Sequence, residues 1–198
     1  MSNRPHPETP TPAISWLALG TPPKAPAEVQ AVLDRTKEKL GYIRNGQLAV
    51  LHRPNLVLGQ DALSRAATQD PDSALSRRER ELIALVVSSE NRCEACVFGH
   101  AAALREITGD PVLVDRLIVN YRHAGLSARE RALADYALKI TRRPGEIDPE
   151  DLDVLRQAGL TEFAILDAAA VAAYFNFSNR INSAIGVTPN PEAASAHR

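Results

Sequence analysis

The chain has 198 residues, of which 44% are apolar and 24% charged, and its net charge is −1. This composition is ordinary for a globular protein and excludes wholesale disorder. The balanced charge argues against a general electrostatic attraction to nucleic acid or to an anionic membrane. No stretch approaches the ~20 apolar residues of a membrane span, and no secretory signal pattern is present. We therefore expect a cytoplasmic protein with no membrane or nucleic-acid partner, forming one domain or two halves that share a core.

The N-terminal segment, residues 1–26, contains seven of the 14 prolines. Proline removes a helix hydrogen-bond donor, so this segment is expected to be an extended arm. Ile14, Trp16, Leu17 and Leu19 lie within it, and these side chains are costly to leave in water. We therefore favour an arm that docks on the rest of the chain or on a neighbouring subunit, with a disordered tail as the alternative.

The segment that follows, residues 27–189, has helical signals throughout. Three capping-box patterns open helices at Ser76, Ser127 and Asp148, each with an acidic residue three positions later. Alternating strand patterns closed by hairpin turns are missing, which predicts an all-α domain of about eight helices with short joints. Residues 190–198 are expected to be a flexible tail. Helices are expected over residues 26–40, 44–52 and 55–69, from residues 76, 127 and 148, and over residues 161–185.

An internal similarity links residues 75–82 to residues 126–133, which agree at six of eight positions. Either a duplicated helical unit or convergence on a good helix start explains it. In the second copy Ala132 belongs to a core-facing stripe, and its counterpart in the first copy is Glu81. The helix that contains Glu81 is apolar nearly all round. A carboxylate there needs a partner or will hold its proton.

A cluster of reactive residues lies shortly after this helix. Cys93, Cys96 and His100 follow the spacing C-x2-C-x3-H, which places all three on one face of a helix. Residues 88–91 include capping types, so we expect the helix to start there, with Cys93 in its first turn. The amide groups and dipole at that end favour a thiolate. His100 is then placed to exchange a proton with Cys96, and Glu81 to orient the imidazole.

Three interpretations of this cluster compete. In the first, the two cysteines are small core residues and His100 is a satisfied core histidine. In the second, two thiolates, His100 and Glu81 form a tetrahedral zinc site, although a second Cys pair is missing from the chain. In the third, which we favour, Cys93 and Cys96 are a redox-active dithiol that forms a sulfenic acid and then a disulfide.

The spacing E-x11-C-x2-C-x3-H of Glu81, Cys93, Cys96 and His100 resembles the active-site motif of the AhpD-like alkylhydroperoxidases, in the carboxymuconolactone decarboxylase superfamily. The similarity extends over roughly residues 30–187 and points to the uncharacterised peroxidase-related subgroup. Its further segments are residues 39–45, 52–54, 126–127, 158–160 and, most tellingly, Tyr-Phe-Asn-Phe-Ser-Asn-Arg at 174–180.

The resemblance implies an all-α fold assembled as a homo-oligomer, a trimer or a hexamer. It implies that Cys96 meets the hydroperoxide, that Cys93 resolves the intermediate, and that Glu81 and His100 relay protons. Better-studied members place a further His between the two cysteines, whereas this chain has Ala95 there. The dipole argument favours Cys93 as the more acidic thiol, so the residues and the resemblance differ on which sulfur attacks.

Together these observations predict a thiol-dependent hydroperoxide reductase that cycles through a Cys93–Cys96 disulfide. With no Gly-rich phosphate loop, we expect no nucleotide or flavin cofactor, so electrons come from an external dithiol of lipoyl or thioredoxin-like type. The alternatives are a disulfide oxidoreductase with weak peroxidase activity, or a non-enzymatic helical oligomer whose cysteines are structural or bind zinc. The polar residues Asn176, Asn179 and Arg180 are expected to bond a neighbouring loop or subunit rather than to form an active-site wall.

Overall fold

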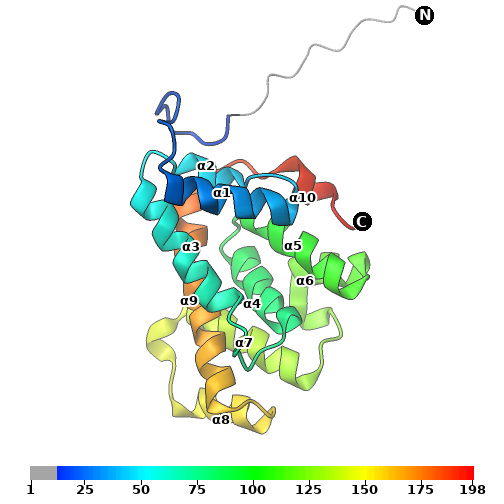
Figure 1. Ribbon diagram of the computed structural model, residues 1–198. Helices are drawn as coiled ribbons and strands as arrows, with labels where there is room; N and C mark the ends of the chain where they lie inside the picture. The colour runs from blue at the N-terminus through cyan, green and yellow to red at the C-terminus, as the bar shows by residue number, and fades with distance from the viewer. Residues whose placement is uncertain (1–12) are drawn as a thin grey trace, which may run out of the picture.

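The computed structural model describes residues 13–198, and within that range the regular structure is entirely helical (Figure 1). The all-α prediction is confirmed, with eight longer helices and two of five residues, α2 and α10. The first four prolines of the arm lie outside the described residues. The helices are α1 (Ala27–Leu40), α2 (Asn45–Ala49), α3 (Pro54–Thr68), α4 (Arg77–Glu90), α5 (Glu94–Thr108), α6 (Pro111–Asn120), α7 (Ala128–Arg142), α8 (Pro149–Gln157), α9 (Glu162–Ala184) and α10 (Pro191–Ser195), with 3-10 turns at Tyr121–His123 and Pro144–Glu146.

The helix starts follow the predicted caps. Ser76, Ser127 and Asp148 each accept a hydrogen bond from the backbone N–H three residues later, and the acidic side chain at that position bonds back to the cap N–H. Thr161 caps α9 through the N–H of Ala164. These local bonds satisfy donors that the first turn of a helix leaves free, so the sequence pattern alone locates the four starts.

Helix α4 is the centre of the molecule because both of its sides are buried. Ile83, Ala84 and Val87 pack in one core with α7, α8 and α9. Leu82, Leu85 and Val86 pack in a second core with α5, α6 and α7. In Figure 1 α4 runs between these helices, while α1 and α2 lie at one end of the molecule and α8 at the other. A third, smaller core joins α1, α2 and α3 to the end of α9 through Ile181 and Ile185.

The starts of α4 and α7 are joined by two ion pairs that mirror one another. Arg78 of α4 donates to Glu130 of α7 at 2.7 Å, and Arg129 of α7 donates to Glu79 of α4 at 2.6 Å. Arg78 and Arg129 are equivalent in the internal sequence similarity, as are Glu79 and Glu130. The repeated segments therefore pack as a local pseudo-twofold pair, in which each capping glutamate also accepts the arginine of the other copy.

The two ends of the described chain bond to each other. The N–H of Trp16 donates to Ile185 at 2.9 Å, and the N–H of Thr188 donates to Ile14 at 2.9 Å. The arm from residue 13 therefore docks on its own chain through its backbone, while the side chains of Ile14 and Trp16 stay exposed. The frayed end expected from residue 190 is instead the short helix α10, because Ala193 is buried there and Asn190 bonds the segment before α2.

A membrane-spanning helix is not found within the described range: only α8 and α9 taken together, across a bend of 116°, reach the required length and apolar character.

We predict that the paired glutamates make the fold acid-sensitive. Burial raises the pKa of Glu79, but hydrogen bonds from Arg129 and from the Ser76 backbone and hydroxyl outweigh it and hold that pKa below its usual 4.5. The stability from this carboxylate is therefore complete above pH 4.5 and is lost as pH falls through the lowered pKa. Glu79→Gln should reduce the free energy of unfolding at neutral pH by about 1–3 kcal/mol.

This prediction is checked by urea unfolding across the acid range. The exposed Glu38 of α1 supplies the control, and Glu38→Gln should leave stability nearly unchanged. An acid dependence identical in Glu79→Gln and the parent protein would contradict the assignment.

Candidate functional site

The turn between α4 and α5 carries both cysteines. Helix α4 continues to Glu90 and ends at Asn91, and α5 begins at Glu94 with Cys93 as its N-cap. The expectation that a helix starts among residues 88–91 is therefore wrong. Ser88 is fully buried in α4, so core packing extends that helix past the capping residues. Arg92 closes the turn in the left-handed region, with φ of 53°.

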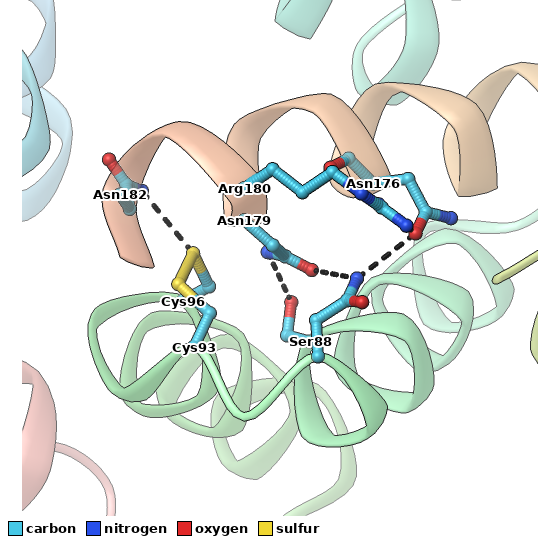
Figure 2. Close-up of a disulfide and its surroundings, with 8 residues drawn as sticks. Ser88, Cys93, Cys96, Asn176, Asn179, Arg180 and Asn182 are labelled. Carbon is cyan, nitrogen blue, oxygen red and sulfur yellow. Dashed lines mark hydrogen bonds between the residues drawn. A yellow bond between two sulfur atoms is a disulfide. The ribbon is translucent and has the colours of Figure 1, made fainter. Parts of the chain in front are cut away.

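Cys93 and Cys96 are joined in a disulfide at the N-terminal end of α5, with Cα atoms 5.3 Å apart (Figure 2). Cys96 is the third residue of the helix, and its Sγ accepts a hydrogen bond from Asn182 Nδ2 at 3.3 Å. Cys93 makes no side-chain capping bond. Both cysteines lie at the N-terminal end of α5, where backbone amides and the helix dipole favour a thiolate, and Cys96 also accepts the Asn182 amide. This contact is a structural argument for Cys96 that the sequence did not offer.

Glu81 has the partner that its position on an apolar helix demands. His100 Nδ1 and Glu81 Oε2 are 2.7 Å apart, with about a fifth of each side chain exposed. The Phe175 ring packs edge-on against the imidazole, with the two ring centroids 4.3 Å apart. Burial raises the pKa of the Glu81 carboxyl, but the charge and hydrogen bond of His100, followed by the charges of Arg44 and Arg77, hold it below its usual value. The carboxylate therefore stays ionised and orients the imidazole with Nε2 as its free nitrogen.

Cys96 and His100 lie one helical turn apart on α5, and Glu81 reaches His100 from α4. The hydrogen bonds of the described residues do not include one between His100 and either sulfur. The structure thus joins Cys93 to Cys96 and Glu81 to His100 as two neighbouring pairs.

A network of amides holds the turn that carries the cysteines (Figure 2). Asn179 is fully buried on α9 and donates to Ser88 Oγ at 3.1 Å. Asn91 donates to the side-chain oxygens of both Asn176 and Asn179, at 3.0 and 3.1 Å. Arg180 donates to the Asn176 carbonyl. Asn176 and Asn179 therefore bond the neighbouring turn, as expected, and fix Cys93 and Cys96 relative to α9, whereas the bonds of Arg180 stay within α9.

Asn182, the residue in direct contact with Cys96, was not among the site residues predicted from the sequence. Its carbonyl side points at Gly46, where a Cβ would lie 3.1 Å from Asn182 Oδ1. Gly46 on α2 therefore leaves room for the orientation that aims Nδ2 at the sulfur. The sequence does contain a signal for Asn182, because this polar residue lies on the same helix face as Asn179. Its contact with Cys96, however, depends on how α9 crosses the start of α5.

Comparison with known proteins agrees with this geometry. The family model described as "Carboxymuconolactone decarboxylase family" matches residues 58–138, which contain all four motif residues. An uncharacterized peroxidase-related protein from Silicibacter sp. TM1040 is 37% identical, and the match covers 97% of this chain and 100% of that one with a TM-score of 0.88. A second structure, described as an alkylhydroperoxidase AhpD core and uncharacterized peroxidase-related protein from Ralstonia eutropha JMP134, is 32% identical over 95% and 98% of the chains, with a TM-score of 0.90.

The chain belongs to the carboxymuconolactone decarboxylase family, in its AhpD-like group. A search of curated proteins finds no match to this member of the family. The debrominase Bmp8, at 22% identity and a TM-score of 0.76 over 90% of this chain and 96% of that one, shares the fold.

In residues 13–198, no three His, Cys, Asp or Glu side chains converge closely enough to hold a metal ion. His100 is directed to Glu81 and the two sulfurs are bonded to each other, so the four predicted ligands form two pairs and not a tetrahedron.

We predict that Asn182→Ala weakens the thiolate of Cys96. Loss of an amide donor to a charged sulfur should move the pH midpoint for alkylation of Cys96 upward by about one unit. The measurement is the rate of iodoacetamide labelling against pH in a Cys93→Ser background. The adjacent, exposed Ser183 provides a matched control, since Ser183→Ala should leave the midpoint in place. Equal midpoints in all three proteins would remove Asn182 from the site.

Proposed function

We propose that this protein is a thiol-dependent hydroperoxide reductase that cycles through the Cys93–Cys96 disulfide. The observation that carries the proposal is a dithiol at a helix start beside a carboxylate–imidazole pair. Full-length likeness to peroxidase-related proteins of the same family supports it. A sulfur with an amide donor and a helix N-terminus is a stabilised nucleophile, and a second sulfur in bonding distance can complete the oxidation.

The oxidative step begins at Cys96. Its thiolate attacks the terminal peroxide oxygen, so that an S–O bond forms and the O–O bond breaks. The alkoxide that leaves takes a proton from His100 and departs as an alcohol, leaving a sulfenic acid on Cys96. The Glu81 carboxylate stabilises the protonated imidazole before that transfer and orients it throughout.

The resolving step uses Cys93. Its sulfur attacks the sulfenic sulfur, the S–S bond forms, and the S–O bond breaks. The hydroxyl group leaves as water with the proton of the Cys93 thiol. An external dithiol then returns two electrons, yielding two free cysteines and its own disulfide. One hydroperoxide and one dithiol are thus converted to one alcohol, one water and one external disulfide.

A homo-oligomer is part of the same proposal. Phe163 and Leu166 on α9 and Val154 on α8 are exposed by more than half of their surface. Large apolar side chains grouped at one end of a molecule favour contact with another protein surface, here a second copy.

A second candidate, a disulfide oxidoreductase with weak peroxidase activity, rests on Ala95. This residue lies between the cysteines, where a titratable side chain would add a second proton path. The dithiol chemistry is the same in both candidates, so they differ only in how fast Cys96 reacts with a hydroperoxide.

We predict that one equivalent of cumene hydroperoxide removes two free thiols per reduced chain within seconds to minutes. In Cys93→Ser one thiol should be lost, and dimedone should trap a sulfenic acid on Cys96. Cys96→Ser should keep its thiol over the same time. Slow oxidation by peroxide combined with rapid exchange with small disulfides would favour the second candidate, and thiols inert to both reagents would contradict both.

We predict that Glu81→Gln slows this oxidation by about ten- to a hundredfold, since general acid–base groups contribute at least that much.

Because the folded pKa of Glu81 lies below its usual value, the carboxylate also stabilises the fold above pH 4.5 and loses that effect as pH falls through the lowered pKa. The stability gap between Glu81→Gln and the parent should therefore narrow in acid. Glu90→Gln, on the same helix but paired outside the site with Arg142, is the control.

A further inference from the structure

Three helices end in the same hydrogen-bonded motif, but one of them lacks the usual glycine. In this motif the residue after the helix cap is left-handed, and the next N–H bonds a carbonyl five residues back. Glycine occupies the left-handed position after α8 and after α9, whereas Arg92 occupies it after α4. The defining bonds are Leu160 N–H to Leu155 O at 3.1 Å, Val187 N–H to Asn182 O at 2.9 Å and Cys93 N–H to Ser88 O at 3.0 Å.

A side chain at such a position costs free energy that glycine avoids. The chain uses glycine at two equivalent ends, so local folding alone does not explain the arginine. Non-glycine residues held in this region gather at functional sites. Arg92 is exposed and immediately precedes Cys93 in the chain.

Arg92 and Cys93 line an open groove of about 360 Å³. Its other walls are Trp16, Glu94, Asn182, Ser183 and the segment of residues 186–189. Trp16 packs so closely over Gly186 that no Cβ would fit there. Cys93 is only 2% exposed and lies at the floor, whereas the Trp16 side chain is 82% exposed at the rim. Cys96 is not part of the lining and is turned toward Asn182, as Figure 2 shows.

We propose that this groove admits the reductant, that the attacked sulfur is Cys93, and that Arg92 and Trp16 bind the incoming group. This inference rests on the proposed function and names its reductive side. The attacking species is a thiolate, and the Arg92 guanidinium attracts it and offsets the repulsion by the Glu94 carboxylate on the same lining. It bonds to Cys93 Sγ while the S–S bond breaks, and Cys96 leaves as the thiolate that Asn182 and the α5 N-terminus stabilise. The second thiolate of the reductant then displaces Cys93, which takes up the released proton.

The size of the groove suits a slender alkyl dithiol. Its volume lies at the lower end of small-molecule sites. A sulfur on the broad surface of a folded domain cannot reach a sulfur that is almost fully covered, whereas one at the end of a narrow chain can. The exposed ring of Trp16 provides an apolar wall for the methylene groups of such a chain.

The first test uses protein oxidised beforehand with diamide and no peroxide, so it does not depend on peroxidase activity. Reduction by dihydrolipoate is followed through thiol release and through the fluorescence of Trp16, the single tryptophan of the chain. Arg92→Gly should lower the second-order rate constant about tenfold at low salt, with a smaller difference at high salt. Arg92→Lys should retain most of the rate. Because glycine suits the backbone here, Arg92→Gly should unfold at the same or a higher temperature.

The second test examines the role of Trp16 and identifies the sulfur that the reductant attacks. Trp16→Ala should slow reduction severalfold while Trp16→Phe restores it, and Leu19→Ala, an arm variant outside the groove, should have no effect. After brief treatment with 2-mercaptoethanol and a quench with N-ethylmaleimide, fragment masses should place the mixed disulfide on Cys93 and the maleimide on Cys96.

The proposal is overturned if Arg92→Gly and Trp16→Ala are reduced at the parental rate, if the mixed disulfide forms on Cys96, or if a reduced thioredoxin domain acts faster than dihydrolipoate. Failure of the proposed function alone has a different signature. Reduction would then follow these expectations while hydroperoxide left the thiols untouched.

Discussion

Helix α4 is buried on both of its sides, and the site follows from that constraint. Each of its five buried Leu, Ile and Val side chains contributes roughly 1.5–3 kcal/mol, which far exceeds the cost of one hydrogen-bonded carboxylate among them. The helix can therefore carry Glu81, but only with a partner. His100 supplies that partner from α5, and the contact joins the central helix to the helix that starts at the two cysteines. The packing that makes the fold stable thus also produces an ionised, oriented carboxylate beside a dithiol.

The cysteine turn is held from three directions. The Cys93 N–H donates to the Ser88 carbonyl and closes the backbone of the turn. Asn176 and Asn179 of α9 bond its side chains. Asn182 of the same helix donates to the sulfur of Cys96. Helix α9 therefore belongs to the core and also contacts the disulfide. In the proposed cycle the disulfide opens and closes, and such a frame keeps the two sulfurs within bonding distance.

The pseudo-twofold packing of α4 against α7 holds at the helix starts and ends where the two similar segments differ. The ion pairs between Arg78, Glu79, Arg129 and Glu130 preserve the symmetry at the helix starts. Two residues further on the symmetry ends, because Glu81 faces His100 where the second copy has a methyl group at Ala132. The arm and residues 186–189 line the groove over Cys93, beside the first of the two similar segments.

Local sequence patterns were sufficient to predict several helix starts and the need of Glu81 for a partner. Capping boxes at Ser76, Ser127 and Asp148 located helix starts because those bonds lie within one turn, and a carboxylate in an apolar helix predicted its own partner. The start of α5 was misplaced because the burial of Ser88 in a distant core extends α4, which no capping residue reveals. Asn182, Arg92 and the groove of Trp16 emerged only from the tertiary structure, since each depends on how α9 and the two chain ends cross the cysteine turn. Sequence periodicity reports which face of a helix is buried, whereas the contact of residues 86 positions apart is decided by packing.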